Sequence, residues 1–362
     1  QDTDFSRRAA LRAGAAACTL PLLPARAQEG AALAVAQIID ESPDQHDVSR
    51  DFLIGARAAW AAVNADGGVR GQRVQHWVLA TQGRGAELRQ AWQAALAQPG
   101  CVALSGCVGD EVAASVATLA AEAPTLAHVA PWLMRPWQDA QDGVFPIFAG
   151  YPAQIEHALR SLGQMGITQA GVVFGRPALR QQWEGSLSQA ARASGLQLHA
   201  TRPEQPPLMV LFAGATPELH GFIDQLRLPA GRQCYVLALA DVNLQVLAQL
   251  GRLPRGVSVI ATQPVPMVGS SLPVVRAYRA ALARWYDEAP TPQGLAGFIA
   301  ARHTADLLAS VPGPITRAGV LAASRRRSAS SVGGYMVRYQ GRELATGLVT
   351  QAMLTADGRI IG

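Results

Sequence analysis

The chain has 362 residues, almost half of them hydrophobic, and a formal net charge of +5. This length suits two domains, because a single hydrophobic core rarely grows beyond about 250 to 300 residues. The basic residues are all arginine, since the sequence contains no lysine. Enzymes that need a Schiff-base lysine or a P-loop lysine are therefore excluded.

Residues 1–27 have the features of a twin-arginine (Tat) export signal. Arg7 and Arg8 are adjacent, an apolar stretch too short to span a membrane follows, and Ala25-Arg26-Ala27 forms a small-residue cleavage site. Cys18 does not fit a lipoprotein anchor, because only alanines precede it directly and more apolar sequence follows. We expect export to the periplasm, with no direct membrane insertion of the mature chain.

The first half of the mature chain alternates strands with helices. Expected strands cover 33–39, 73–80, 102–104, 125–130 and 144–148, and expected helices cover 49–64, 86–97 and 112–123. This order favours an open parallel sheet. The segment 40–47 carries four acids in eight residues, and its simplest interpretation is a solvated loop.

The pattern restarts after residue 150. Expected helices cover 153–165, 179–193, 217–226 and 242–250, and expected strands cover 171–174, 196–200, 209–212, 235–240 and 257–262. Helices over 273–286, 294–310 and 316–324 follow, and 334–362 has β character with a hairpin turn at Asp357-Gly358. The predicted fold class is α/β, with two doubly wound parallel-sheet lobes and a ligand site at their junction.

The stretch from 102 to 132 is the first candidate site. A short strand ends at Ser105, a loop of small residues leads to Asp110 at the expected N-cap of a helix, and a second strand ends before Trp132. Ligands bind beyond the carboxyl ends of such parallel strands, so both loops face one space. The candidate ligand-binding residues here are Cys107, Gly109, Asp110, His128, Ala130 and Trp132. The alternatives are an ordinary structural unit and, for His128, a place in the core.

The cysteines predict neither a disulfide nor a metal centre. Cys101 and Cys107 flank one strand and lie about 20 Å apart, whereas bridged Cα atoms lie within about 7 Å. We expect free, mostly buried thiols. Cys107 and His128 as metal ligands would lack a recognisable third ligand, so no metal or other cofactor is expected.

Nucleic acid is not an expected partner. The arginines are scattered, apart from Arg325-Arg326-Arg327, and no aromatic residues are interleaved with them. We interpret the triplet as a solvated loop.

The segment Asn64-Ala65-Asp66-Gly67-Gly68-Val69-Arg70-Gly71 resembles the one that closes the first helix in periplasmic receptors for branched-chain amino acids and amides. Further similar segments include Gly106-Cys107-Val108-Gly109, Phe212 to Glu218, Gly333-Gly334-Tyr335 and Asp357-Gly358-Arg359. The resemblance implies a type I periplasmic-binding fold, in which two lobes joined by three crossings close on a solute. It places lobe 1 at 28–147 plus 264–332 and lobe 2 at 148–263 plus 333–362.

The resemblance also implies roles for single residues. Asp241 matches the acid that holds a ligand ammonium, although an N-cap role for the helix at Val242 is an equal alternative. Tyr151 matches a tyrosine at the first crossing. Arg176 either takes a ligand carboxylate or is solvated. Asp110 departs from the Ser or Thr that relatives often have, and a carboxylate there repels a ligand anion.

The function that follows is a receptor that delivers a small-molecule ligand to the membrane permease components of an ABC importer. The alternative is a sensory or accessory protein of the same fold whose pocket has lost its ligand. We do not expect an enzyme, because the sequence contains no Gly-x-Ser-x-Gly, no His-Glu-x-x-His and no phosphate loop.

Overall fold

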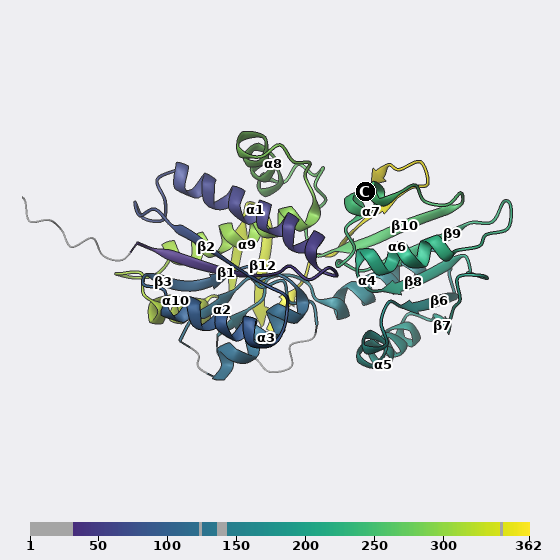
Figure 1. The fold of residues 1–362 in the computed structure, drawn as a ribbon, viewed down its shortest axis with the longest axis horizontal. Coiled ribbons are helices and arrows are strands. Elements are labelled where there is room, and N and C mark those ends of the chain that lie inside the picture. Colours follow the sequence, from purple (N-terminus) through teal and green to yellow (C-terminus); the bar gives the residue numbers. More distant parts are fainter. Residues whose placement is uncertain (1–31, 123–124, 136–142, 341–342) are drawn as a thin grey trace, which may run out of the picture. The chain divides into compact units, whose positions relative to one another are not determined.

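The computed structural model describes residues 32–122, 125–135, 143–340 and 343–362. These residues form two α/β lobes and a small third sheet (Figure 1). The predictions for Arg7, Arg8, Cys18 and the cleavage site lie outside the described residues. So does Ala123, the expected last residue of the third helix.

Lobe 1 is built on a five-stranded parallel sheet in the order β2-β1-β3-β4-β5. Its strands are β1 (Ala34–Asp40), β2 (Gln75–Thr81), β3 (Cys101–Ser105), β4 (Ala127–Val129) and β5 (Val144–Phe145). Its helices are α1 (His46–Ala65), α2 (Gly85–Ala97), α3 (Asp110–Glu122), α8 (Pro273–Trp285), α9 (Pro292–Ala309) and α10 (Arg317–Arg326).

Strand β1 is buried along its whole length because helices cover both faces of the sheet. Val35 and Ile39 point to the face covered by α1 and α9. Ala34, Ala36 and Ile38 point to the face covered by α2 and α3. Strand β1 ends at Asp40, and helices α1 and α3 begin near this carboxyl end of the parallel strands.

Lobe 2 repeats this plan. Strands β6 (Gln169–Phe174), β7 (Gln197–Ala200), β8 (Met209–Ala213), β9 (Cys234–Ala238) and β10 (Val257–Gln263) pair in parallel in the order β7-β6-β8-β9-β10. Helices α4 (Tyr151–Gln164) and α5 (Pro177–Ala193) cover one face, and α6 (Thr216–Gln225) and α7 (Leu244–Leu250) cover the other. The sheet is not wholly parallel, because β14 (Thr350–Leu354) and β15 (Ile360–Ile361) join it in antiparallel pairing.

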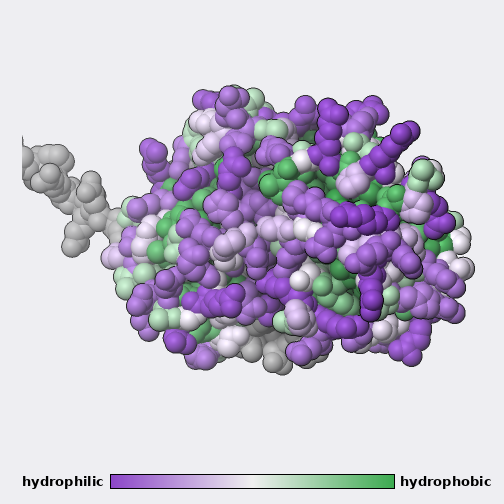
Figure 2. Space-filling view, turned by 45° about the vertical axis from the view of Figure 1, so that its right-hand side comes forward, coloured by the Kyte–Doolittle hydropathy of each residue, from purple (hydrophilic) through white to green (hydrophobic). Residues whose placement is uncertain are grey.

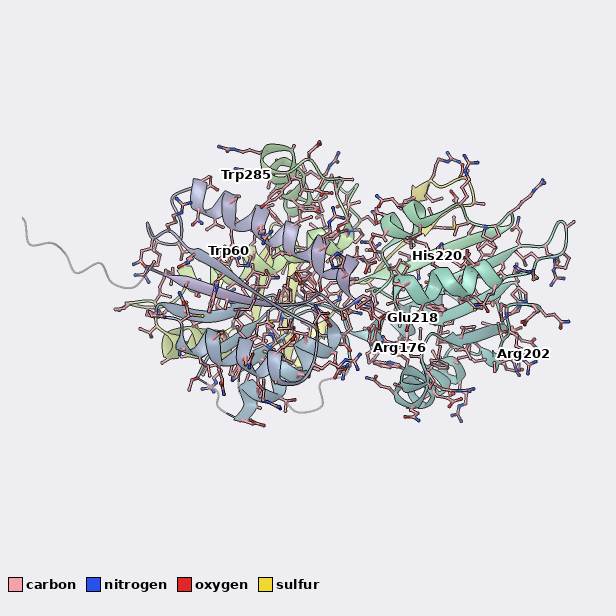
Figure 3. All side chains as sticks on the ribbon, viewed as in Figure 1. Trp60, Arg176, Arg202, Glu218, His220 and Trp285 are labelled. Carbon is pink, nitrogen blue, oxygen red and sulfur yellow. The ribbon has the colours of Figure 1, made fainter. Side chains whose placement is uncertain are left out.

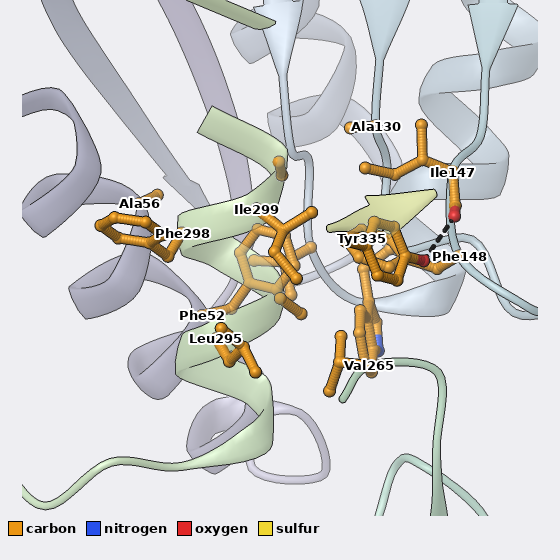
Figure 4. Packing of buried hydrophobic residues seen from close by; sticks show 14 of the residues in the cluster. Phe52, Ala56, Ala130, Ile147, Phe148, Val265, Leu295, Phe298, Ile299 and Tyr335 are labelled. Atoms are coloured by element: carbon orange, nitrogen blue, oxygen red, sulfur yellow. Dashed lines mark hydrogen bonds between the residues drawn. The ribbon is translucent and has the colours of Figure 1, made fainter. Parts of the chain in front are cut away.

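Helices α1 and α9 pack backbone to backbone in lobe 1. A Cβ atom on Gly55 would lie 1.7 Å from the Gly294 carbonyl oxygen, and one on Gly297 would lie 1.9 Å from the Phe52 carbonyl oxygen. Only glycine fits at either place. This contact brings Phe52 against Trp132 and Phe148, with ring centroids 5.7 and 6.4 Å away. The aromatic cluster fills the base of lobe 1 beside the crossings (Figure 4).

Three segments of chain connect the lobes, and Tyr335 ties two of them together. Its hydroxyl lies 2.7 Å from the Ile147 carbonyl oxygen in the first segment (Figure 4). It also lies 3.2 Å from the Pro264 carbonyl oxygen in the second segment. The third segment lies near 347–349, because Thr350 bonds to the Val265 carbonyl and starts β14.

The resemblance implies a third crossing around Gly333, and strand pairing favours a later position. Strand β12 (Tyr335–Gln340) pairs with β11 (Ala329–Val332) and β13 (Glu343–Thr346) in a separate small sheet. That sheet stays with lobe 1, since β11 packs on α9 and Tyr335 enters the aromatic cluster. We therefore propose that lobe 1 continues to residue 346 and that lobe 2 comprises 148–263 and 347–362.

Several local predictions are settled by the structure. The Asp357-Gly358 hairpin is confirmed, with Gly358 at φ 84° between β14 and β15. The arginine triplet is not a solvated loop, because Arg325 and Arg326 end helix α10, where cations suit the helix dipole. Helix α1 starts at His46 rather than after Ser49, whose buried hydroxyl has no partner in the described part of the chain.

The face drawn in Figure 2 carries mostly hydrophilic side chains, with hydrophobic ones in smaller patches between them. Within the described residues, no helix has the length and apolar character needed to cross a membrane.

Candidate functional site

A cleft of about 340 Å³ lies between the two lobes. Its lobe 1 wall includes Asp40, Asp44, Gln82, Arg84, Asp110 and Arg135, and its lobe 2 wall includes Tyr151, Arg176, Trp183, Gly214, Leu239 and Asp241. Most of these residues directly follow the carboxyl ends of strands in the two sheets. In a sheet of order 2-1-3-4-5 the ligand crevice opens between the first and third strands, and both walls fit that rule.

On the lobe 1 wall, Asp110 begins helix α3 without capping it. One carboxylate oxygen accepts hydrogen bonds from the backbone N–H groups of Met134 (2.8 Å) and Arg135 (2.9 Å). The other accepts from Nε of Arg135 at 2.8 Å, and Arg135 also pairs with Glu111. Burial lowers the pKa of Arg135, but the charges and hydrogen bonds of Asp110 and Glu111 outweigh it and raise that pKa. Asp110 therefore holds the loop after β4 in place on the lobe 1 wall of the cleft.

Arg176, on the lobe 2 wall, is neither free nor simply solvated. Its guanidinium pairs with Asp44 of lobe 1 at 3.0 Å and with Glu218 of lobe 2 at 2.8 Å. Figure 3 shows Arg176 and Glu218 side by side. Glu218 is held in turn by the backbone N–H of Ala215. Arg176 thus bridges the lobes in this conformation, with both neighbouring carboxylates already engaged.

Asp241 is the most perturbed group of the cleft. Burial is the largest cause that raises its pKa to about 8, and the negative charge of Asp110 adds to it. The hydrogen-bond donor of the Trp132 side chain lowers the pKa. Its Oδ2 accepts a short hydrogen bond from the Tyr151 hydroxyl. Its Oδ1 has no hydrogen-bond partner among the described residues. Asp241 therefore keeps one buried acceptor oxygen that is not used by the Tyr151 hydrogen bond.

The alternative role of Asp241 as an N-cap is wrong. Helix α7 begins at Leu244, and Asn243 caps it by accepting from the backbone N–H groups of Gln245 and Val246. The Asp241 side chain does not cap the helix because α7 starts three residues later, at Leu244.

Tyr151 lines the cleft at the start of α4, and its ring packs edge-on against Trp183 at a centroid distance of 4.7 Å. Trp183 comes from helix α5 and was not predicted. Amphipathic spacing in α5 marks Trp183 as a buried residue, but it does not show that the buried face borders a cleft.

Other candidate residues of the stretch 102–132 lie in the protein interior and not on the cleft wall. Cys107 and Ala130 are completely buried, Trp132 is 1% exposed, and Gly109 packs on Asp40, whose Cβ a side chain at Gly109 would meet at 2.5 Å. Ala130 takes a left-handed conformation with φ 51° directly after β4. These residues support the wall from behind.

His128 has the core role that the sequence left open. It is completely buried on β4, and burial lowers its pKa to about 3. Neither ring nitrogen has a hydrogen-bond partner among the described residues. Cys107 is also inert, since burial raises the pKa of its thiol to about 12. Cys101, Cys107 and Cys234 are free and buried. In the described part of the chain, no group of three or more His, Cys, Asp or Glu side chains is placed to hold a metal ion.

Three acids near the start of α1 contact lobe 2, which corrects the interpretation of 40–47 as a solvated loop. Besides the pair of Asp44 with Arg176, Asp47 accepts from the Thr216 hydroxyl at 2.6 Å and Asp51 accepts from Nδ2 of Asn243 at 2.8 Å. Burial is the largest cause that raises the pKa of both Asp47 and Asp51. The acids in and just before α1 therefore form polar contacts between lobe 1 and lobe 2.

Several cleft residues escaped prediction. Asp40, Gln82 and Arg84 follow the first two strands, and Arg135 follows the fourth. Their place after a parallel strand was a usable signal, but it was not applied to these four residues.

A two-lobed α/β chain with a polar cleft at the strand ends of both sheets has the architecture of a solute-binding protein. Residues 33–208 match a family model described as "Periplasmic binding protein". No curated protein matches the sequence.

Solved structures share the fold over almost the whole chain. A substrate-binding periplasmic protein from Ralstonia solanacearum is 22% identical, with 91% of this chain and 99% of that one covered at a TM-score of 0.76. A leucine binding protein from Thermotoga maritima is 17% identical (91% and 97%, TM-score 0.73). A fatty acid ABC transporter substrate-binding protein from Thermomonospora curvata is 14% identical (91% and 90%, TM-score 0.69). The chain is thus similar in fold to type I periplasmic binding proteins of the leucine-binding type, as the sequence indicated.

Proposed function

We propose that this protein is an exported receptor that captures a small polar or amphipathic solute between its lobes and delivers it to the membrane permease of an ABC importer. The observation that carries the proposal is the cleft, whose walls come from the strand ends of both sheets and present polar and aromatic side chains to one another. The similarity to transport receptors supports it. Capture requires closure around the solute and no bond-making step.

The ligand class proposed from the sequence is an amino acid, an amide or a related organic acid. Within it, Asp241 is the proposed contact for an amine or amide N–H, because this residue lines the cleft and its buried Oδ1 has no hydrogen-bond partner in the described part of the chain. A charge-assisted hydrogen bond at this place contributes about 1.5 to 3 kcal/mol. Tyr151 and Trp183 supply the apolar contact.

A thermal-shift screen with amino acids, amides, amines and organic acids tests the proposal. A compound at a hundred times its Kd stabilises the native state by about 2.7 kcal/mol, which is a shift of several degrees. We expect at least one compound to act and Asp241→Asn to weaken it. A flat response to the whole panel, together with a stable protein partner, would favour the accessory role instead.

We also propose that the chain reaches the periplasm by the twin-arginine route. Replacing Arg7 and Arg8 by glutamine should leave the precursor in the cytoplasm, as fractionation and immunoblotting will show. A periplasmic product from this variant contradicts the route and leaves the receptor function untouched.

A further inference from the structure

The charges on the cleft wall do not suit a ligand carboxylate. Five carboxylates line the cleft against three arginines. Arg135 is held by Asp110 and Glu111, and Arg176 is held by Asp44 and Glu218. Arg84 has no ion pair among the described residues, and it is exposed. A ligand anion would have to compete with two carboxylates at either of the other arginines.

The start of helix α3 is closed to anions as well. The free N–H groups of a helix N-terminus normally favour a negative group. Here the Asp110 carboxylate lies at that place and is fixed by three hydrogen bonds from Met134 and Arg135. A ligand carboxylate would meet this fixed negative charge.

The same wall suits a cation. Asp241 is 9% exposed and lines the cleft, and its Oδ1 has no partner in the described part of the chain. The Trp132 side chain lies close enough to act as a hydrogen-bond donor that lowers the Asp241 pKa, although its indole N–H forms no well-aligned hydrogen bond in the described part of the chain. Beside Asp241, the rings of Tyr151 and Trp183 offer π-electrons, which attract ammonium and guanidinium groups. A cation bound between Asp110 and Asp241 would offset the charge of Asp110 and favour the ionised form of Asp241.

We propose that the cleft selects small organic cations that carry no carboxylate, namely amines or guanidines, with Asp241 as the contact for the cationic head and Asp110 as the residue that excludes carboxylates. This inference rests on the receptor function proposed above and narrows its ligand class.

Proton release follows from the same geometry. Burial and the Asp110 charge raise the pKa of Asp241 to about 8, so its carboxyl holds a proton at pH 7 in the empty cleft. A bound cation favours the ionised carboxylate and displaces that proton. Cation affinity should therefore rise about tenfold per pH unit below pH 8 and level off above it.

Isothermal titration calorimetry of the full-length mature protein with matched pairs tests the inference. The pairs are agmatine with arginine, cadaverine with lysine, and 3-methylbutylamine with leucine, and each differs only in the carboxylate. We expect one amine to bind at least tenfold more tightly than its parent amino acid. Titration at pH 7 in two buffers of different ionisation enthalpy should show release of nearly one proton.

Two variants assign the roles. Asp110→Asn removes the charge and keeps an oxygen for the backbone N–H groups, and it should reduce the preference for the amine at least tenfold. Asp241→Asn should weaken amine binding at least tenfold and abolish proton release. Thermal unfolding of each variant verifies its fold, and the matched pairs on the unaltered protein test the inference even if a variant does not fold.

The outcomes separate the two proposals. Equal or tighter binding of the parent amino acids overturns the exclusion of carboxylates and leaves the receptor function standing. If amides or acids bind and no amine binds, the inference is also overturned. A lack of binding by any compound counts against the receptor function itself.

Discussion

Asn243 offers the most direct test of how the lobes hold together. Its side chain is completely buried and makes two kinds of contact. Oδ1 caps helix α7 within lobe 2, and Nδ2 donates to the Asp51 carboxylate of lobe 1 at 2.8 Å. Asn243→Ala removes both contacts, whereas Asn243→Ser keeps a capping oxygen and is too short to reach Asp51.

The two losses differ in size. A hydrogen bond to a charged group contributes about 1.5 to 3 kcal/mol, and an N-cap contributes about 1 kcal/mol. We expect Asn243→Ser to lower the free energy of unfolding by about 1.5 to 3 kcal/mol and Asn243→Ala by about 1 kcal/mol more. The Asn243 bond lowers the pKa of Asp51 against burial, which raises it. The deficit of both variants should therefore grow with pH as Asp51 ionises.

Urea unfolding followed by circular dichroism measures these free energies at pH 5 and pH 8. The reasoning is refuted if Asn243→Ser unfolds like the unaltered protein at both pH values. That result would mean that the bond between the lobes contributes nothing to the ligand-free state in solution.

Three further predictions concern the core and the buried titratable groups. Gly297→Ala should lower the free energy of unfolding by about 3 kcal/mol or more, because its Cβ would overlap the Phe52 carbonyl; the matched change Gly221→Ala, with open space around it, should raise it by about 0.4 to 1 kcal/mol in the same urea titration. The Asp241 carboxyl keeps its proton up to about pH 8 in the folded state but loses it near pH 4 when unfolded, so its contribution to stability falls as pH rises between these values, by ~6 kcal/mol at most. Asp47 and Asp51 contribute in the same direction, so unfolding curves of Asp241→Asn should show a smaller fall. An unchanged slope contradicts the raised pKa of Asp241. Burial raises the pKa of Cys107 to about 12, so iodoacetamide should label it only after unfolding, as mass spectrometry of peptides will show.

The succession of strands and helices was predictable because each lobe buries its sheet on both faces. Runs such as 33–39 are apolar for that reason, and in the helices between the strands apolar residues recur every three to four positions. The position of the third crossing was not predictable, because short strands after Gly333 have the same local sequence pattern whether they join the large sheet or a separate one. Strand β12 pairs locally with β11, and only β14 reaches β10.

The cleft was predictable only in part. Position after a strand end identified Asp110 and Arg176 as candidates, and the family resemblance identified Tyr151 and Asp241; all four line the cleft. Position alone does not tell which side of a loop a residue faces. Cys107 and His128 belong to the same loops and strands as the wall, yet they are completely buried because their side chains point into the sheet packing. Contacts between the lobes, such as that of Asp51 with Asn243, join residues far apart in the sequence and leave no local signal.

The buried acids connect lobe closure with ligand charge. Asp47 and Asp51 face donors of lobe 2, and their raised pKa values mean that closure over them is easier when protons are available. Asp241 faces Asp110 across the cleft and has a hydroxyl partner on only one oxygen. A proton satisfies all three acids, but an organic cation can replace it only at Asp241, since Thr216 and Asn243 occupy the other two. Mild acid should therefore favour closure of the empty protein and oppose cation capture. We expect the ligand-free protein to show a smaller radius of gyration in X-ray scattering at low pH. Amine binding should be weaker at the same pH.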